Sequence, residues 1–91
     1  MSSTILYEPT PNPNSLKFIA PGKAFPVEGM ESFRSAEEAS NHPLGRALFA
    51  LEGVDNVFIM PAFLTVTKKP EADWDVLLPA IIRVLEEHLQ D

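Results

Sequence analysis

Residues 54–68 read VDNVFIMPAFLTVTK and predict two β-strands joined by a short turn at Pro61-Ala62. In the second strand, residues 63–68, Leu64 and Val66 alternate with Phe63 and two threonines. Because successive side chains of a strand point to opposite faces, this alternation indicates a sheet with one well-covered face. We expect helices to supply that cover.

Two further β-prone runs lie upstream, at residues 4–7 and 15–19. In the second run, Leu16 and Phe18 fall on one face and Lys17 on the other. The segment between the runs, PTPNPN at residues 9–14, contains three prolines, each of which fixes φ and cannot donate a backbone hydrogen bond. We interpret it as a stiff loop that joins two antiparallel strands.

A third strand is predicted at residues 24–27, at an edge of the sheet, because only an edge tolerates Pro26. Residues 29–34 are expected to be irregular. Ser35 and Glu38 have capping-box spacing, which predicts a short helical turn.

A first helix is predicted to begin at Pro43, with His42 in the cap position, and to end at Gly53. Gly45 is a weak point within it, since glycine costs about 1 kcal/mol against alanine in a helix interior. The side chains expected to be buried are Leu44, Ala47, Leu48 and Leu51.

The last helix is predicted over roughly residues 74–90, capped by Asp73. Pro79 interrupts this pattern, so either the helix kinks there or its regular part begins near Leu78. The apolar side chains that recur at helical spacing are Trp74, Leu77, Leu78, Ile81, Ile82, Leu85 and Leu89.

These elements follow one another in the order β-β-(β)-α-β-β-α. Helices that follow pairs of antiparallel strands favour an α+β fold, a two-layer sandwich of a mainly antiparallel sheet with helices packed on one face. The length of 91 residues suits a single domain, residues 1–91.

Composition excludes several classes of function. The formal charge is −6, a sign that repels nucleic acid, and the sequence has no cysteine, which removes thiolate chemistry and thiolate-held clusters. The longest apolar stretch, residues 57–66, is about half a membrane span, and the N-terminus lacks the pattern of a secretory signal. We therefore expect a cytoplasmic monomer with no membrane or nucleic-acid partner.

Catalytic or metal chemistry has little support in the sequence. The histidines, His42 and His88, are weak metal candidates because they are far apart and fit no ligand spacing. The carboxylate pairs 37–38, 73–75 and 86–87 are typical of solvated helix surfaces. We expect a protein that is not an enzyme, with no catalytic residues.

The proline-rich loop is one candidate partner surface. Thr10, Asn12 and Asn14 could supply directional hydrogen bonds from a preordered backbone, which lowers the entropy lost on binding. The alternative interpretation, a rigid connection without a binding role, is equally consistent with the sequence.

The outer face of the sheet is the other candidate. Lys17, Phe58 and Phe63 are expected there, with Met60 and Tyr7 as further members. An exposed cluster of this kind marks a partner site. Alternatively, residues 28–34 could fold over it, with Met30 and Phe33 as a lid.

Residues 10–18, TPNPNSLKF, resemble the opening of the N-terminal domain of Nfu/NifU iron–sulfur scaffold proteins. The resemblance extends in order through Phe33-Arg34-Ser35, Pro43-Leu44, Leu48-Phe49, Glu52-Gly53-Val54, Val57-Phe58, Phe63 to Lys68, and Asp73-Trp74 with Leu77. The chain departs from the family at His42 and Gly45, where serine and alanine are common.

The resemblance implies a role in iron–sulfur cluster assembly or delivery. Two-domain relatives hold the cluster on a CxxC motif in a separate domain, whereas we expect a stand-alone domain here. The leading hypothesis is a non-catalytic accessory module that docks onto a cluster scaffold, carrier or target protein and meets the cluster only through that partner. The alternative is a protein that binds iron or another divalent metal through histidine and carboxylate ligands.

Overall fold

The computed structural model describes residues 5–89, which form one antiparallel sheet and two helices. The strands are β1 (Leu6–Pro9), β2 (Ser15–Ile19), β3 (Glu31–Phe33), β4 (Val54–Ile59) and β5 (Leu64–Lys68), and the helices are α1 (Pro43–Phe49) and α2 (Trp74–His88). The strand order is β1-β2-β5-β4-β3, and every neighbouring pair is antiparallel.

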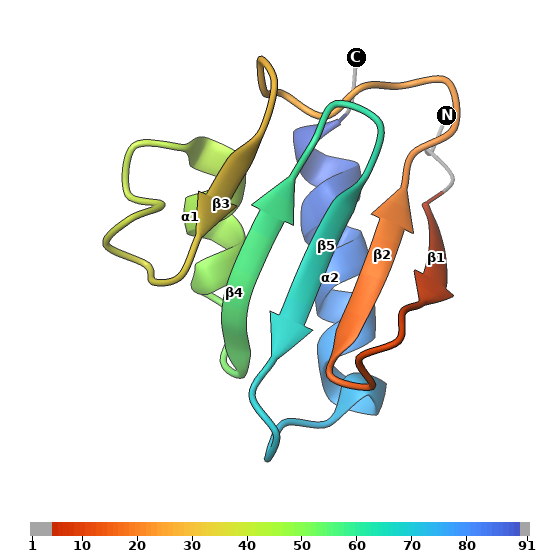
Figure 1. The fold of residues 1–91 in the computed structure, drawn as a ribbon, viewed down its shortest axis with the longest axis vertical. Coiled ribbons are helices and arrows are strands. Elements are labelled where there is room, and N and C mark those ends of the chain that lie inside the picture. Colours follow the sequence, from red (N-terminus) through yellow and green to blue (C-terminus); the bar gives the residue numbers. More distant parts are fainter. Residues whose placement is uncertain (1–4, 90–91) are drawn as a thin grey trace.

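Both helices lie behind the sheet in Figure 1, and no helix covers the face toward the viewer. The structure therefore confirms the predicted α+β fold with helices on one face. Thr4 and Gln90, at the predicted outer ends of the first strand and the last helix, lie outside the described residues.

The alternation in residues 63–68 sets the inner face of the sheet. Leu64 and Val66 are fully buried, and they lie opposite Phe18 of β2 and Val57 of β4 respectively. On the helix side, Leu77, Ile81 and Leu85 are buried at intervals of four residues, as the amphipathic pattern predicts. Burial of each such side chain is worth about 1.5–3 kcal/mol, so this layer contact is the main source of stability.

A β-bulge interrupts β4 at Asp55. Val54 lies opposite Lys68 and Asn56 opposite Thr67, so Asp55 has no partner on β5. The extra residue lets both Val54 and Val57 reach the core although three positions separate them.

The predicted edge strand at residues 24–27 is wrong, since the third strand is β3, which lies at one edge of the sheet in a segment expected to be irregular. Pro26 has no N–H to donate. The N–H of Phe25 instead donates to the Pro61 carbonyl at 3.0 Å, and its ring is buried in the core. Burial of this ring anchors the segment to the β4–β5 turn, away from the sheet edge.

Helix α1 begins at Pro43 as predicted but ends at Phe49, before Gly53. Gly53 has φ +101°, and an added Cβ would lie 2.8 Å from that of Ala72, so glycine is needed in the turn that follows. Helix α2 begins at Trp74 and includes Pro79 within its span.

Candidate functional site

The outer face of the sheet brings together residues from three strands. Lys17 lies opposite Thr65, and Thr65 lies opposite Phe58, so all three side chains share the face that no helix covers. Phe63, just before β5, completes the group, and both phenylalanines are half-buried. We call Lys17, Phe58 and Phe63 the outer-face cluster.

Ring and charge contacts order this cluster. The Lys17 Nζ lies 4.8 Å from the centre of the Phe63 ring, and the Phe63 and Phe58 ring centres are 6.2 Å apart. A cation at this distance from an aromatic face gains about 0.5–1 kcal/mol at an exposed site. The cluster therefore presents an apolar surface with an ammonium group held against it.

Glu8 is a neighbour of Lys17 that the sequence pattern did not indicate. Its carboxylate is 3.9 Å from the Lys17 Nζ, and the two residues lie opposite each other on β1 and β2. The loop between these strands has five residues, and its length sets the register in which they pair. The loop length could therefore have predicted that Glu8 lies opposite Lys17. An exposed pair at this distance is worth about 0–1 kcal/mol, and it leaves Lys17 available to a partner.

The alternative in which residues 28–34 fold over this face as a lid is not the arrangement that the structure has. Phe33 is buried on the helix side, against Gly45 and His42, and Met30 is 59% exposed. Tyr7 was expected on the outer face, but it lies opposite Phe18 and contacts that ring at 6.3 Å, on the helix side. The outer face is therefore open.

Internal hydrogen bonds occupy the three polar residues of the proline-rich loop. The Thr10 hydroxyl donates to the Asn12 carbonyl at 2.9 Å, and Asn12 Oδ1 accepts from the Asn14 N–H at 2.9 Å. Asn14 Oδ1 accepts from the buried Lys68 ammonium at 3.0 Å. These bonds account for a stiff loop, and they leave the side chains fewer groups to offer a partner.

Trp74, the first residue of α2, binds the proline-rich loop. Its indole N–H donates to the Pro13 carbonyl at 3.2 Å, and the Lys68 ammonium lies 6.0 Å from the ring centre. In Figure 1 the loop lies at the lower end of β2, whereas Phe63 precedes β5 at the upper end of the sheet. The structure thus separates the two candidate surfaces.

His42 caps α1, in the position expected from the sequence. Its Nδ1 accepts from the Gly45 N–H at 3.1 Å, and its Nε2 lies 3.1 Å from the Pro26 carbonyl. A neutral ring with its proton on Nε2 satisfies both contacts. Both ring nitrogens are therefore used within the fold.

The ring of His88 is also engaged, with Nδ1 at 2.9 Å from the Val84 carbonyl. Within residues 5–89, no three histidine, aspartate or glutamate side chains gather closely enough to hold a metal ion. The described part of the chain also contains no helix with the length and apolar character needed to span a membrane.

The chain matches the family model described as "Scaffold protein Nfu/NifU N terminal" over residues 5–91. The human "NFU1 iron-sulfur cluster scaffold homolog, mitochondrial" is 51% identical over 73 residues, which are 79% of this chain and 28% of that protein. The Arabidopsis thaliana "NifU-like protein 5, mitochondrial" is 43% identical over 76 residues, 84% of this chain and 27% of that protein. The chain thus spans little more than a quarter of these relatives.

Solved structures share the fold. A NifU-like protein from Saccharomyces cerevisiae superposes with a TM-score of 0.83 at 26% identity, over 94% of this chain and 77% of that one. Protein SAV1430 from Staphylococcus aureus gives 0.76 at 23% identity, over 94% and 100% of the two chains. At that identity the second likeness shows the fold alone.

The cytoplasmic expectation is contradicted, because the similar NFU1 and NifU-like proteins are named as mitochondrial. The prediction rested on the absence of cysteine and of a secretory signal. Neither observation distinguishes one reducing compartment from another, so composition carried no information on this point.

Proposed function

Because this chain belongs to the family of Nfu/NifU scaffold protein N-terminal domains, we propose that it serves iron–sulfur cluster assembly as a non-catalytic docking module. It binds, as a monomer, a scaffold, carrier or target protein that holds the cluster. The observation that carries the proposal is the open outer face of the sheet, with the outer-face cluster at its centre.

The chemistry of cluster binding supports a role through a partner. Protein ligands of iron–sulfur clusters are mainly cysteine thiolates, and this sequence has none. The alternative of a resident metal held by His42 or His88 lacks support, since the ring nitrogens of His42 are used and His88 has no convergent ligands among residues 5–89. We therefore place the cluster on the partner, outside this chain.

The outer-face cluster is suited to a protein contact. Phe58 and Phe63 offer apolar area that is already ordered by mutual packing, so little side-chain entropy is lost on binding. Lys17 adds a charge that can meet a carboxylate at the rim. A second copy of this chain is disfavoured as occupant, because two molecules of charge −6 repel each other.

Nuclear magnetic resonance can test this proposal. The ¹⁵N-labelled chain would be titrated with a cysteine-bearing iron–sulfur scaffold protein, once loaded with cluster and once without it. We expect saturable shifts at the amides of residues 17, 58 and 63. Lys17→Glu should weaken binding about tenfold, equivalent to about 1.4 kcal/mol.

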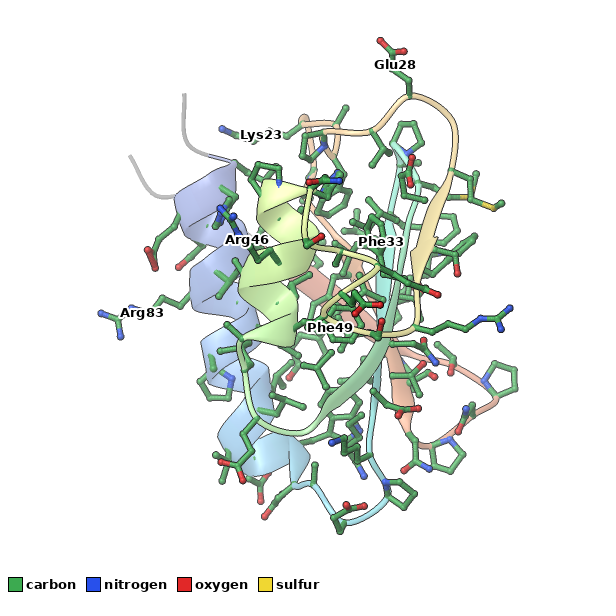
Figure 2. All side chains as sticks on the ribbon, turned by 90° about the vertical axis from the view of Figure 1, so that its left-hand side faces the viewer. Lys23, Glu28, Phe33, Arg46, Phe49 and Arg83 are labelled. Atoms are coloured by element: carbon green, nitrogen blue, oxygen red, sulfur yellow. The ribbon has the colours of Figure 1, made fainter. Side chains whose placement is uncertain are left out.

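Arg83→Glu provides the matched control, because it makes the same charge change on the side of α2 that faces away from the sheet (Figure 2). Phe58→Thr keeps a β-prone residue and removes the ring, and it should also weaken binding. Equal losses in Lys17→Glu and Arg83→Glu would show that only net charge matters, and the proposed surface would then be abandoned.

A further inference from the structure

Strand β1 forms one edge of the sheet. It pairs on one side only, with β2, and in Figure 1 it is the outermost strand, with no helix behind it. All four of its residues are exposed, including Leu6 at 49% and Tyr7 at 50%. This edge is therefore open to solvent over its whole length.

The opposite edge, β3, has features that block pairing and that β1 lacks. β3 is only three residues long, and Glu31 lies opposite the fully buried Ile59, so its side chain projects from the helix side of the sheet. A very short strand and a charge on the inward face both discourage a further strand. The one charge on β1, Glu8, lies on the outer face opposite Lys17. Pairing at the β1 edge is not opposed in this way.

Pro9 indicates which backbone groups of β1 face outward. Along an antiparallel pair, residues alternate between positions bonded to the partner strand and positions whose N–H and C=O point away from it. Pro9 lies opposite Leu16 and has no N–H, so it occupies an outward position. By alternation, the N–H and C=O of Tyr7 also point outward, and those of Glu8 point toward β2. Among residues 5–89, no backbone bond outside the strand pairing involves residues 6–9.

The edge is held in extended form before anything binds. Its register on β2 is regular over all four residue pairs, and the Tyr7 and Phe18 ring centres are 6.3 Å apart. The loop that follows is ordered by the bond from the Thr10 hydroxyl to the Asn12 carbonyl. Little conformational entropy of this chain is therefore lost when a segment pairs with β1.

We propose that the β1 edge binds an extended segment of a partner protein as a sixth strand of the sheet. The Tyr7 N–H and C=O bond to the backbone of that segment, which supplies affinity without demanding one sequence. One apolar side chain of the segment lies beside the half-exposed Tyr7 ring, and another lies beside Leu6 on the outer face. The inference goes beyond the proposed function, because it requires nothing of the outer-face cluster.

Backbone pattern and charge determine the kind of segment. A helix uses its backbone donors and acceptors internally, so an open strand edge is matched by another strand. Glu8 and Lys17 have opposite charges at this edge, so the segment needs no charge of its own. A second copy of this chain is disfavoured, since each copy has a formal charge of −6. The occupant is therefore an uncharged segment rich in β-branched residues.

Amide hydrogen exchange tests the edge geometry in the protein alone. The Tyr7 amide, which points outward, should exchange rapidly. The Glu8 amide, which points toward β2, should exchange about tenfold more slowly after correction for sequence. Equal rates, or the reverse order, would overturn the assignment of outward groups.

Binding is tested with the peptide acetyl-Thr-Val-Thr-Val-Thr-amide and a control peptide that is N-methylated at its three central residues. Each is titrated into the ¹⁵N-labelled chain. Methylation removes backbone N–H donors and leaves the side chains unchanged. We expect saturable shifts at residues 6–9 and slower exchange of the Tyr7 amide with the first peptide, and neither effect with the control.

Two variants separate the backbone from the ring. Tyr7→Pro removes the outward N–H and spares the bonds to β2, so it should weaken binding about tenfold, equivalent to about 1.4 kcal/mol. Tyr7→Thr also loses the ring but keeps the N–H, and it should retain most of the affinity. Unchanged amide shifts at residues 16–18 of β2 verify that β1 still pairs in each variant.

Several outcomes would overturn the proposal. Equal binding of the control peptide would show that side chains alone drive the contact, and equal losses in Tyr7→Pro and Tyr7→Thr would assign it to the ring. Shifts centred on residues 58 and 63 would place the peptide on the outer face. Shifts at residues 6–9 on concentrating the chain alone would assign the edge to a second copy, and no shift at about 1 mM peptide would leave it without a strand to bind. The docking of a cluster scaffold is decided separately, by its own titration.

Discussion

Gly45→Ala is expected to destabilise this protein, although the same change stabilises most helices. An added Cβ at Gly45 would lie 2.9 Å from Cε2 and 3.0 Å from Cδ2 of the Phe33 ring, and 3.2 Å from the Cβ of Ala39. Phe33 is 7% exposed and Ala39 is fully buried, so neither neighbour has free space behind it. Helix α1 and strand β3 approach each other across this glycine.

Two opposing contributions set the magnitude. Replacing a helical glycine by alanine gains about 1 kcal/mol from backbone propensity. Forcing an extra methyl group into a packed core costs typically about 1–3 kcal/mol. With a cost near the middle of that range, we expect a net loss of about 1 kcal/mol in the free energy of unfolding, or a fall in Tm of about 4–8 °C.

Urea unfolding monitored by circular dichroism measures this change, provided that the slope m stays constant. Arg46→Ala compared with Arg46→Gly gives the propensity term at an exposed position of the same helix. The double variant Gly45→Ala/Phe33→Leu should lose less than the sum of its single variants, because the smaller side chain vacates the space that the new methyl group enters.

A gain of about 1 kcal/mol in Gly45→Ala, equal to the Arg46 difference, would refute this reasoning. It would mean that the Phe33 ring moves aside without cost. The glycine would then be a simple weak point of α1, as its sequence context alone suggests.

Three further changes test the cap, the loop and the last helix. His42→Ala should cost about 1 kcal/mol in urea unfolding, whereas His42→Ser should retain most of the stability because a hydroxyl can accept the same Gly45 N–H. Lys68→Met removes the ammonium that donates to Asn14 Oδ1, so amide hydrogen exchange at residues 12, 14 and 15 should accelerate several-fold while the slope m stays unchanged; unchanged exchange would show that the remaining bonds suffice. Asp73→Ala should lower stability by about 0.5–2 kcal/mol and Asp73→Ser by much less, since Asp73 Oδ1 accepts from the Asp75 N–H at 2.9 Å; equal losses would argue against a capping role.

Local patterns predicted most of the elements correctly. The alternation around Leu64 and Val66 identified the inner face of β5, and the spacing of Leu77, Ile81 and Leu85 identified the buried side of α2. Both patterns are periodic because burial on one face repeats with the geometry of the element itself. The cap at His42 was equally visible, since it depends on residues within one helical turn.

The errors concern contacts between distant segments. Pro26 correctly indicated that no interior strand could form near it, but burial of Phe25 against the β4–β5 turn moved the edge strand to residues 31–33. Tyr7 was placed on the wrong face, because a short strand of four residues has too little alternation to determine its orientation.

For the candidate sites, the sequence suggested Lys17, Phe58 and Phe63 as surface residues, and the register of three strands brings them together. An open hollow that Arg34 and Lys69 both line was not foreseen, because those residues are 35 positions apart in the sequence and reach it from the segments that follow β3 and β5. Nothing local connects them.

The sequence by itself determined the number and type of the main elements, the inner face of the long strands and helix, and the absence of sulfur ligands. Only the tertiary structure decided which segment became the third strand, how closely the Phe33 ring packs against Gly45, and which charged residues line the same hollow. The physical reason is range: periodicity and capping arise within a few residues, whereas pairing register and close packing depend on segments that the chain brings together only on folding.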